Sequence, residues 1–293
     1  MAGGLSPAAA LPTEVRTRAA RRRSPAVWLL LGPPSLVLTL LFMLPIGLVL
    51  VTSITDPRMS LAHYQRIFTV PLYTHVMLNT FVTSLVVTAL CLVLGYPVAY
   101  VMARRSDWVS TLLLTIVAMS FWTGFLVRTY AWLVILGSKG PVTGAYQALG
   151  LGPAPQLLFT SFASTLGMTH ILLPYMILAL FAVMKKIEPD QLKAAASLGA
   201  RPRAAFAAVF LPLSLPGVVN GSLLVFVSCL GFFVTPILLG TPRDMMISQL
   251  INQQIEELLA WGFASAVAVI LLIATGLILV VYNRFAGLDR LWG

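Results

Sequence analysis

Three histidines and two cysteines are the side chains of this 293-residue sequence that most readily serve as metal ligands or nucleophiles. His63, His75 and His170 are isolated from one another, and Cys91 and Cys229 each lie inside an apolar run. Neither set has the spacing of a metal site or a disulfide framework. The sequence also lacks the GxxxxGK[ST], GxSxG and HExxH motifs and a pair of catalytic carboxylates. We therefore expect no catalytic residue, no metal site and no cofactor in this chain, which argues against a membrane enzyme.

Arg128 is the one fixed charge inside a long apolar stretch, where a charge is costly and normally faces protein or water. Two interpretations remain open: Arg128 lines or gates a solute pathway near an outer membrane face, or it reaches the membrane surface beside Tyr130 and Trp132. The rings of Tyr130, Trp132, Tyr175 and Phe232 offer faces that attract an ammonium group, although ordinary packing also accounts for them. A cationic solute would make Arg128 a poor direct ligand.

The composition indicates that these side chains lie in a membrane protein. Hydrophobic residues make up 59% of the sequence and charged residues 10%, with a mean hydropathy of +0.93, whereas soluble proteins carry about 25% charged residues. A spanning helix takes about 20 apolar residues, and six stretches are long enough: approximately 27–52, 79–102, 109–137, 162–184, 214–240 and 260–282. The third exceeds one span, so it is expected either to run past the hydrocarbon core or to bend near Gly124. We therefore predict an all-α membrane protein with six transmembrane helices within residues 27–285.

The basic residues indicate the orientation of these spans. If both termini lie on one side, that side carries fourteen Lys and Arg residues and the opposite side four. The positive-inside rule then places both termini in the cytoplasm. Residues 1–26 are interpreted as a disordered basic tail before an uncleaved first span, and 286–293 as a cytoplasmic C-terminal tail. The basic excess therefore reflects topology rather than binding to nucleic acid.

The loop between the fifth and sixth stretches contains a further predicted element. Residues 249–255 have the pattern of an amphipathic helix at the outer surface, flanked by Arg243, Asp244, Glu256 and Glu257. Contact with a solute-binding partner and a purely structural role both remain open.

The cytoplasmic loop at about 185–213 has the pattern of a short helix, a glycine and a second helix. Asp190 is expected to be the N-cap of the first helix, with Pro189 just ahead. The alanine-rich segment that follows favours helix, and Gly199 stands where a left-handed residue would end it. Pro202 suits the first turn of the next helix. Such a small, compact helix could enter a groove on a partner protein.

This loop resembles the cytoplasmic signature of the inner-membrane permeases of ATP-binding-cassette importers, E-A-A-x-x-x-G followed about nine residues later by I-x-L-P. The chain has KAAASLG from Lys193 to Gly199 and VFLP from Val209 to Pro212, so Lys193 departs from the usual glutamate. The resemblance implies that this loop docks an ATPase, through Glu188, Asp190, Lys193, Ala194, Ala195, Leu198, Gly199, Arg201, Leu211 and Pro212. It covers residues from about 28 to 285, and several stretches, such as GYPVAY at Gly95–Tyr100, resemble the spermidine/putrescine-type subgroup.

The resemblance carries expectations for the whole system. It implies a type I importer permease fold in a bacterial inner membrane, and uptake of a small organic solute, with a polyamine favoured, by alternating access. The expected partners are a second permease subunit of a different chain, two ATPase subunits that use ATP and Mg²⁺, an extracytoplasmic solute-binding protein and membrane lipid. Two alternatives stay open: an importer for another solute, such as an amino-acid derivative or a sugar, and an ion-coupled secondary carrier. The carrier is disfavoured because no acidic residue lies in the middle of a predicted span.

Overall fold

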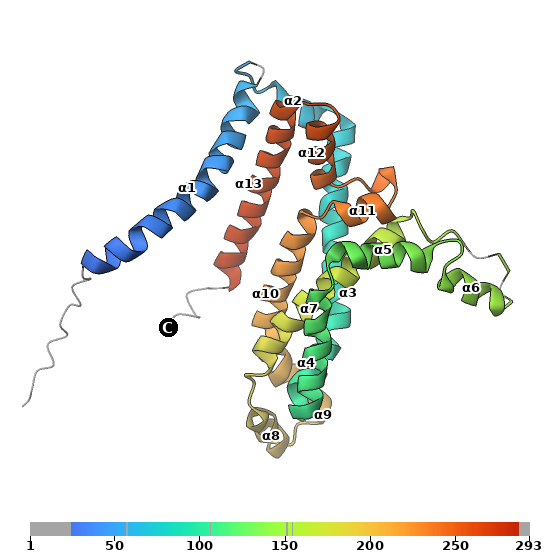
Figure 1. The fold of residues 1–293 in the computed structure, drawn as a ribbon. Coiled ribbons are helices and arrows are strands. Elements are labelled where there is room, and N and C mark those ends of the chain that lie inside the picture. The colour runs from blue at the N-terminus through green and yellow to red at the C-terminus, as the bar shows by residue number, and fades with distance from the viewer. Residues whose placement is uncertain (1–24, 57, 106, 151, 154, 287–293) are drawn as a thin grey trace, which may run out of the picture. The chain divides into compact units, whose positions relative to one another are not determined.

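The computed structural model describes residues 25–56, 58–105, 107–150, 152–153 and 155–286, and every regular element in these ranges is helical (Figure 1). The predicted tails lie outside the described residues, apart from Pro25 and Ala26, which begin α1 (Pro25–Thr55), and Ala286. The chain divides into two compact units, Met1–Gly47 and Leu48–Gly293. The first unit holds the beginning of α1, and every site described below belongs to the second.

Five helical segments in the described residues are long and apolar enough to cross a membrane, or six if one bent pair counts as a single span. The five are α1, α3 (Pro71–Arg104), α7 (Ser161–Met184), the helical run Pro202–Leu230 that ends in α10 (Leu211–Leu230), and α13 (Trp261–Ala286). The bent pair joins α4 (Asp107–Trp122) to the segment Phe125–Ala148, which contains α5 (Phe125–Leu136) and α6 (Pro141–Ala148), at an angle of 94°. The predicted bend near Gly124 is therefore confirmed.

Shorter helices occupy the connecting segments. They are α2 (Ala62–Thr69), α8 (Pro189–Ser197), α9 (Pro202–Ala205), the π-helical turn η1 (Phe206–Phe210), α11 (Val234–Leu239), the 3₁₀ turn η2 (Pro242–Asp244) and α12 (Ile247–Glu256). Helix α12 confirms the helix predicted for residues 249–255.

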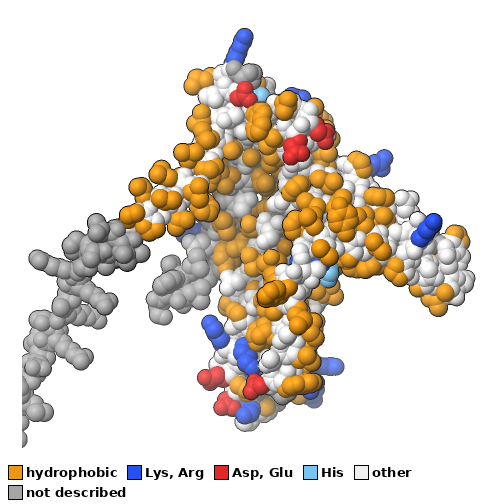
Figure 2. Space-filling view, viewed as in Figure 1, with side chains coloured by type: hydrophobic (Ala, Val, Ile, Leu, Met, Phe, Trp, Pro, Cys, Tyr) orange, Lys and Arg blue, Asp and Glu red, His pale blue; other side chains and the backbone are white. Residues whose placement is uncertain are grey.

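Figure 2 shows charged side chains around α8 at one end of the Leu48–Gly293 unit and around α2 and α12 at the other, with a mostly hydrophobic surface between them. This distribution is that of a membrane-spanning bundle.

The core of the bundle is formed where α7 packs against α3 and α10. Glycines bring the three helices close together: a Cβ atom at Gly95 of α3 would lie 3.1 Å from Cγ of Met176, and one at Gly221 of α10 would lie 2.8 Å from its Sδ. Such close contacts between small and large side chains are how helices associate in lipid, where apolar burial alone gives no preference for a neighbouring helix.

The prediction of a fifth span over residues 214–240 was wrong in its boundaries. The helical run begins earlier, at Pro202, and α10 ends at Leu230; residues 231–233 are not helical, and α11 follows separately. The break has a physical cause, because Pro236 has no N–H group to donate to the Phe232 carbonyl four residues earlier. That carbonyl instead accepts a hydrogen bond from the Ser248 hydroxyl of α12. Pro236 then lies in the first turn of α11, where a missing N–H group is harmless.

Candidate functional site

The first candidate site is the loop from Lys185 to Pro212, which we call the docking loop. Its helix α8 ends in two backbone hydrogen bonds, from the Gly199 N–H group to the Ala196 carbonyl (2.9 Å) and from the Ala200 N–H group to the Ala195 carbonyl (3.1 Å). This pattern is a Schellman motif, in which the residue after the helix is left-handed. Gly199 has φ +86°, as the sequence predicted. Pro202 begins the next helix, which is also confirmed.

The expectation that Asp190 caps α8 was wrong. Glu188 occupies the N-cap position without a side-chain hydrogen bond, and Pro189 is the first helical residue. Asp190 therefore lies in the first turn, where the helix dipole favours an acidic side chain. Its carboxylate accepts a 2.8 Å hydrogen bond from Lys193 Nζ, and this contact holds the pKa of Asp190 below its ordinary value. Both side chains are exposed, so the pair adds little stability.

The docking loop presents one face to the rest of the chain and one outward. Ile187 is buried, and Leu192 packs against the main core cluster. The remaining side chains of α8 are mostly exposed, and the Leu198 side chain that follows it is 90% exposed. The outward face of α8 is therefore open to contact with another protein. Arg201, Leu211 and Pro212, the remaining predicted docking residues, are also exposed.

Arg104 is a residue of this site that the sequence analysis missed, since it was counted only as one of the cytoplasmic charges. It lies in the last turn of α3, its Nη1 donates a 3.5 Å hydrogen bond to the Ile187 carbonyl, and its guanidinium lies 4.9 Å from the centre of the Phe210 ring. Phe210 belongs to η1, directly before α10. Arg104 thus links α3, the docking loop and the helix leading to α10. The only sequence signal was its position at the end of an apolar stretch, next to this loop in the predicted topology.

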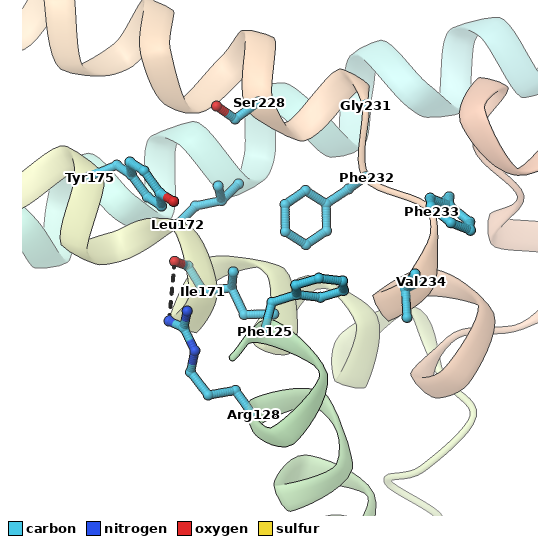
Figure 3. Close-up of a pocket in the computed structure, with 10 residues that line it drawn as sticks. All are labelled: Phe125, Arg128, Ile171, Leu172, Tyr175, Ser228, Gly231, Phe232, Phe233 and Val234. Atoms are coloured by element: carbon cyan, nitrogen blue, oxygen red, sulfur yellow. Dashed lines mark hydrogen bonds between the residues drawn. The ribbon is translucent and has the colours of Figure 1, made fainter. Parts of the chain in front are cut away.

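The second candidate site is a cavity of about 290 Å³ in the Leu48–Gly293 unit, where α5, α7, the end of α10 and the break at 231–233 meet (Figure 3). Four aromatic rings, two hydroxyl groups, one guanidinium and aliphatic side chains line it. The residues are Phe125, Arg128, Ile171, Leu172, Tyr175, Ser228, Gly231, Phe232, Phe233 and Val234. The lining is therefore mainly aromatic, and its one fixed charge is positive.

The structure brings together three of the five predicted pathway residues in this cavity: Arg128, Tyr175 and Phe232. The other two do not line it. Tyr130 is 56% exposed, and Trp132 donates a 3.2 Å hydrogen bond from its indole nitrogen to Nδ1 of His170 on α7. Tyr130 is two residues from Arg128 along α5, so its side chain points to a different face of the helix. Trp132 is four residues from Arg128 and is instead held by its hydrogen bond to His170. His170, expected to be a structural residue, helps to attach α5 to α7.

A polar cluster at η2 lies apart from both sites. The carboxylate of Asp244 accepts hydrogen bonds from Ser161 Oγ (2.6 Å), from Thr241 Oγ1 (2.6 Å) and from the Thr241 N–H group (3.2 Å). Partial burial works against ionisation, but the three donors outweigh it, so the pKa of Asp244 lies below its ordinary value. The cluster joins the start of α7 to the segment that leads into α12. Within the described part of the chain, no three His, Cys, Asp or Glu side chains are placed to hold a metal ion.

Comparison with known proteins agrees with the docking-loop resemblance. Residues 93–288 match the family described as "Binding-protein-dependent transport system inner membrane component". The spermidine/putrescine transport system permease protein PotB of Salmonella typhimurium (strain SL1344) is 34% identical over 226 residues, which cover 77% of this chain and 78% of the relative. PotB of Escherichia coli (strain K12) is 35% identical over 226 residues, with coverage of 77% and 82%.

The fold is similar to that of solved importers. A chain from the crystal structure of a bacterial alginate ABC transporter, in complex with alginate pentasaccharide-bound periplasmic protein, matches with a TM-score of 0.71 and 19% sequence identity, over 90% of this chain and 95% of that chain. At this identity the likeness concerns the fold alone, and it confirms the predicted type I importer permease fold.

Proposed function

Because this chain belongs to the family of binding-protein-dependent transport system inner membrane components, and is the permease of an ATP-driven importer, we propose that it carries a polyamine into the cytoplasm. The observation that carries the proposal is the identity of 34–35%, over about three quarters of the chain, to permeases named for spermidine and putrescine. Family membership leaves the ion-coupled carrier without support. The chain is a multi-pass membrane protein, and we place it in a bacterial inner membrane.

The cavity chemistry is compatible with a polyamine that passes through without being tightly held. The rings of Phe125, Tyr175 and Phe232 can attract an ammonium group through their faces, and the hydroxyls of Tyr175 and Ser228 can accept its hydrogen bonds. Arg128 repels a cation, so it does not act as a direct ligand. A pathway needs this balance, because a solute that binds too tightly is not released.

Uptake by cells tests the solute assignment. The chain, expressed with its partner subunits in a bacterium lacking its own polyamine importers, should confer uptake of radiolabelled spermidine or putrescine that unlabelled polyamine competes away. Uptake no greater than that of cells carrying an empty vector, with the assembled complex present in the membrane, would contradict it. Competition by an amino-acid derivative or a sugar instead would identify one of the alternative solutes.

We further propose that the docking loop faces the cytoplasm and receives an ATPase subunit. The distribution of Lys and Arg supports this orientation, and both termini and the segments outside residues 27–285 then lie on the same side. The outward face of α8 and the exposed Leu198 side chain would enter the ATPase groove. ATP and Mg²⁺ are used by that partner chain.

The way in which the docking loop is attached supports transport by alternating access. A displacement of α8 would be passed through the buried Ile187 and through Arg104 to α3, and through Phe210 to α10. Both helices pack against α7, which lines the cavity. The expected assembly is two permease subunits of different chains, two ATPase subunits and an extracytoplasmic solute-binding protein that delivers the polyamine, with α12 at the face that meets it.

A further inference from the structure

The guanidinium of Arg128 is poorly satisfied by its own chain. Its Nη1 makes one long hydrogen bond, 3.5 Å to the Ile171 carbonyl, and its Nε is buried without a partner in the described part of the chain (Figure 3). The side chain as a whole is half-buried, but its Nε–H group is costly, because it has lost its water without gaining an acceptor. The geometry therefore calls for an acceptor that the described residues of one copy of this chain do not supply.

The depth of Arg128 makes this cost larger. In the proposed topology α4 begins at the cytoplasmic side, and its 16 residues rise about 24 Å at 1.5 Å per residue. The chain then turns by 94° into the segment that carries Arg128. The hydrocarbon core of a bilayer is about 30 Å thick, so Arg128 lies in its outer part. A charge at this depth faces protein or a water-filled cavity and has a partner.

That partner is not an acidic residue of the described chain. The described residues contain seven acids, which lie in connecting segments, at helix ends or in α8: Asp56, Asp107, Glu188, Asp190, Asp244, Glu256 and Glu257. None of them lines the cavity, and the two ion pairs in the described ranges, Lys185–Asp107 and Lys193–Asp190, lie at the docking-loop end. A polyamine cannot pair with Arg128 either, since both are cations.

We propose that Arg128 pairs with a membrane-embedded Asp or Glu of the second permease subunit, and that an ammonium group of the solute displaces the guanidinium from this carboxylate during transport. The inference rests on the proposed function and deepens it. Charge complementarity selects a carboxylate. The exposed apolar side chains at the bend between α4 and α5, among them Trp122 (92% exposed) and Phe125 of the cavity lining, provide the surface on which a second subunit would pack. Without solute, the pair holds α5 closed over the cavity; with solute, the carboxylate receives an ammonium group and α5 is released.

The exchange also explains why a pathway for a cationic solute is lined by the positively charged Arg128. The carboxylate is neutralised in both states, first by Arg128 and then by the solute, so this acid is never left unpaired in the membrane. The released guanidinium then repels the solute and favours its passage onward. The carboxylate must belong to a subunit with a sequence different from this one, which agrees with a heterodimer.

Charge exchange between the two permease subunits tests the proposal in the assembled complex. Arg128→Glu places two acids together and should lower spermidine uptake at least about tenfold, since breaking a buried charge pair costs more than 1.4 kcal/mol. Each intramembrane Asp or Glu of the second permease is then changed to Arg in the Arg128→Glu background. We expect one of these combinations to restore uptake by about tenfold over Arg128→Glu alone. Lys139→Glu, an exposed charge reversal in the loop after α5, is the control and should transport like the native protein.

The second readout is ATP hydrolysis by the purified complex without the solute-binding protein. Arg128→Met removes the charge and should raise this basal rate, because α5 is no longer held closed, while the yield of complex stays unchanged. The proposal is overturned if no exchange restores uptake, if Arg128→Met behaves like the native protein, or if only the yield falls. A native complex whose ATPase responds to the binding protein but which imports no polyamine would instead overturn the solute assignment, and with it the displacement step.

Discussion

Replacing Gly199 by valine tests the docking loop through one backbone torsion. Gly199 has φ +86°, and a Cβ atom built at this position would have no atom within 4 Å. The substitution therefore causes no steric clash, and its whole effect is the cost of holding a side chain in the left-handed region. That cost is roughly 1–2 kcal/mol for an ordinary residue and more for a β-branched one.

The expected loss of ATPase affinity follows from this cost. If the native path of α8 must be kept for the ATPase to bind, a penalty of 1–2 kcal/mol lowers the apparent affinity by a factor of about 5–30. The membrane helices should still insert, because their hydrophobicity is unchanged. Gly199→Asn should be nearly silent, since asparagine tolerates the left-handed region. Lys193→Glu should also be well tolerated, because it disturbs only an exposed pair with Asp190.

The assay is binding of the purified ATPase to the permease in nanodiscs, followed by uptake measurements. The matched control is Gly152→Val, because Gly152 has φ +91° and equally open space but lies in the loop between α6 and α7. Gly152→Val introduces the same backbone strain at a position outside the docking loop, so it should leave ATPase binding intact. Native affinity and native uptake by Gly199→Val would refute the docking assignment; equal losses in both valine variants would show general destabilisation instead.

Three further predictions use other parts of the chain. Gly221→Leu should lower the melting temperature and the yield of the permease far more than Gly276→Leu. A Cβ atom at Gly221 would lie 2.8 Å from Met176 Sδ, whereas one at Gly276 would have no atom within 4 Å. A native melting temperature for Gly221→Leu would contradict the tight packing of α10 against α7. The pKa of Asp244 is lowered in the folded protein, so its ionised form adds stability above its ordinary pKa of about 4, and this stability is lost as the pH falls through the lowered folded-state value. The difference in melting temperature between the native protein and Asp244→Asn should therefore be present at pH 7 and shrink as the pH falls below the ordinary pKa. A phosphatase inserted near Gly140 should be active and one fused at the C-terminus inactive, and the reverse pattern would overturn the proposed topology.

The sequence alone determined the properties that depend on composition and short-range pattern. Apolar length and few charges indicated a membrane protein with about six spans, since the cost of burying charge in lipid applies to any arrangement of the helices. The left-handed Gly199 and the first-turn Pro202 were also predictable, because helix ends are governed by residues a few positions apart. The docking signature led from these local features to the family.

Asp190 shows that two local patterns can compete. Two neighbouring residues could begin α8, and the choice depended on Pro189 preferring the first helical position. The fifth stretch shows where local pattern stops being sufficient. Its hydrophobicity continues to residue 240, but the helix ends at Leu230, because Pro236 cannot donate to the Phe232 carbonyl and the Ser248 hydroxyl of α12 donates to it instead.

Only the tertiary structure decided which side chains share a site. Arg128, Tyr175 and Phe232 are far apart in the sequence, and their meeting in one cavity depends on the 94° bend after α4 and on the break after α10. Arg104 gained its role in the same way, from a phenylalanine more than 100 residues later. Contacts of this kind arise from the packing of whole helices. That packing depends on side-chain volumes and glycine positions on several segments at once, so the hydrophobic pattern of any one segment does not reveal it.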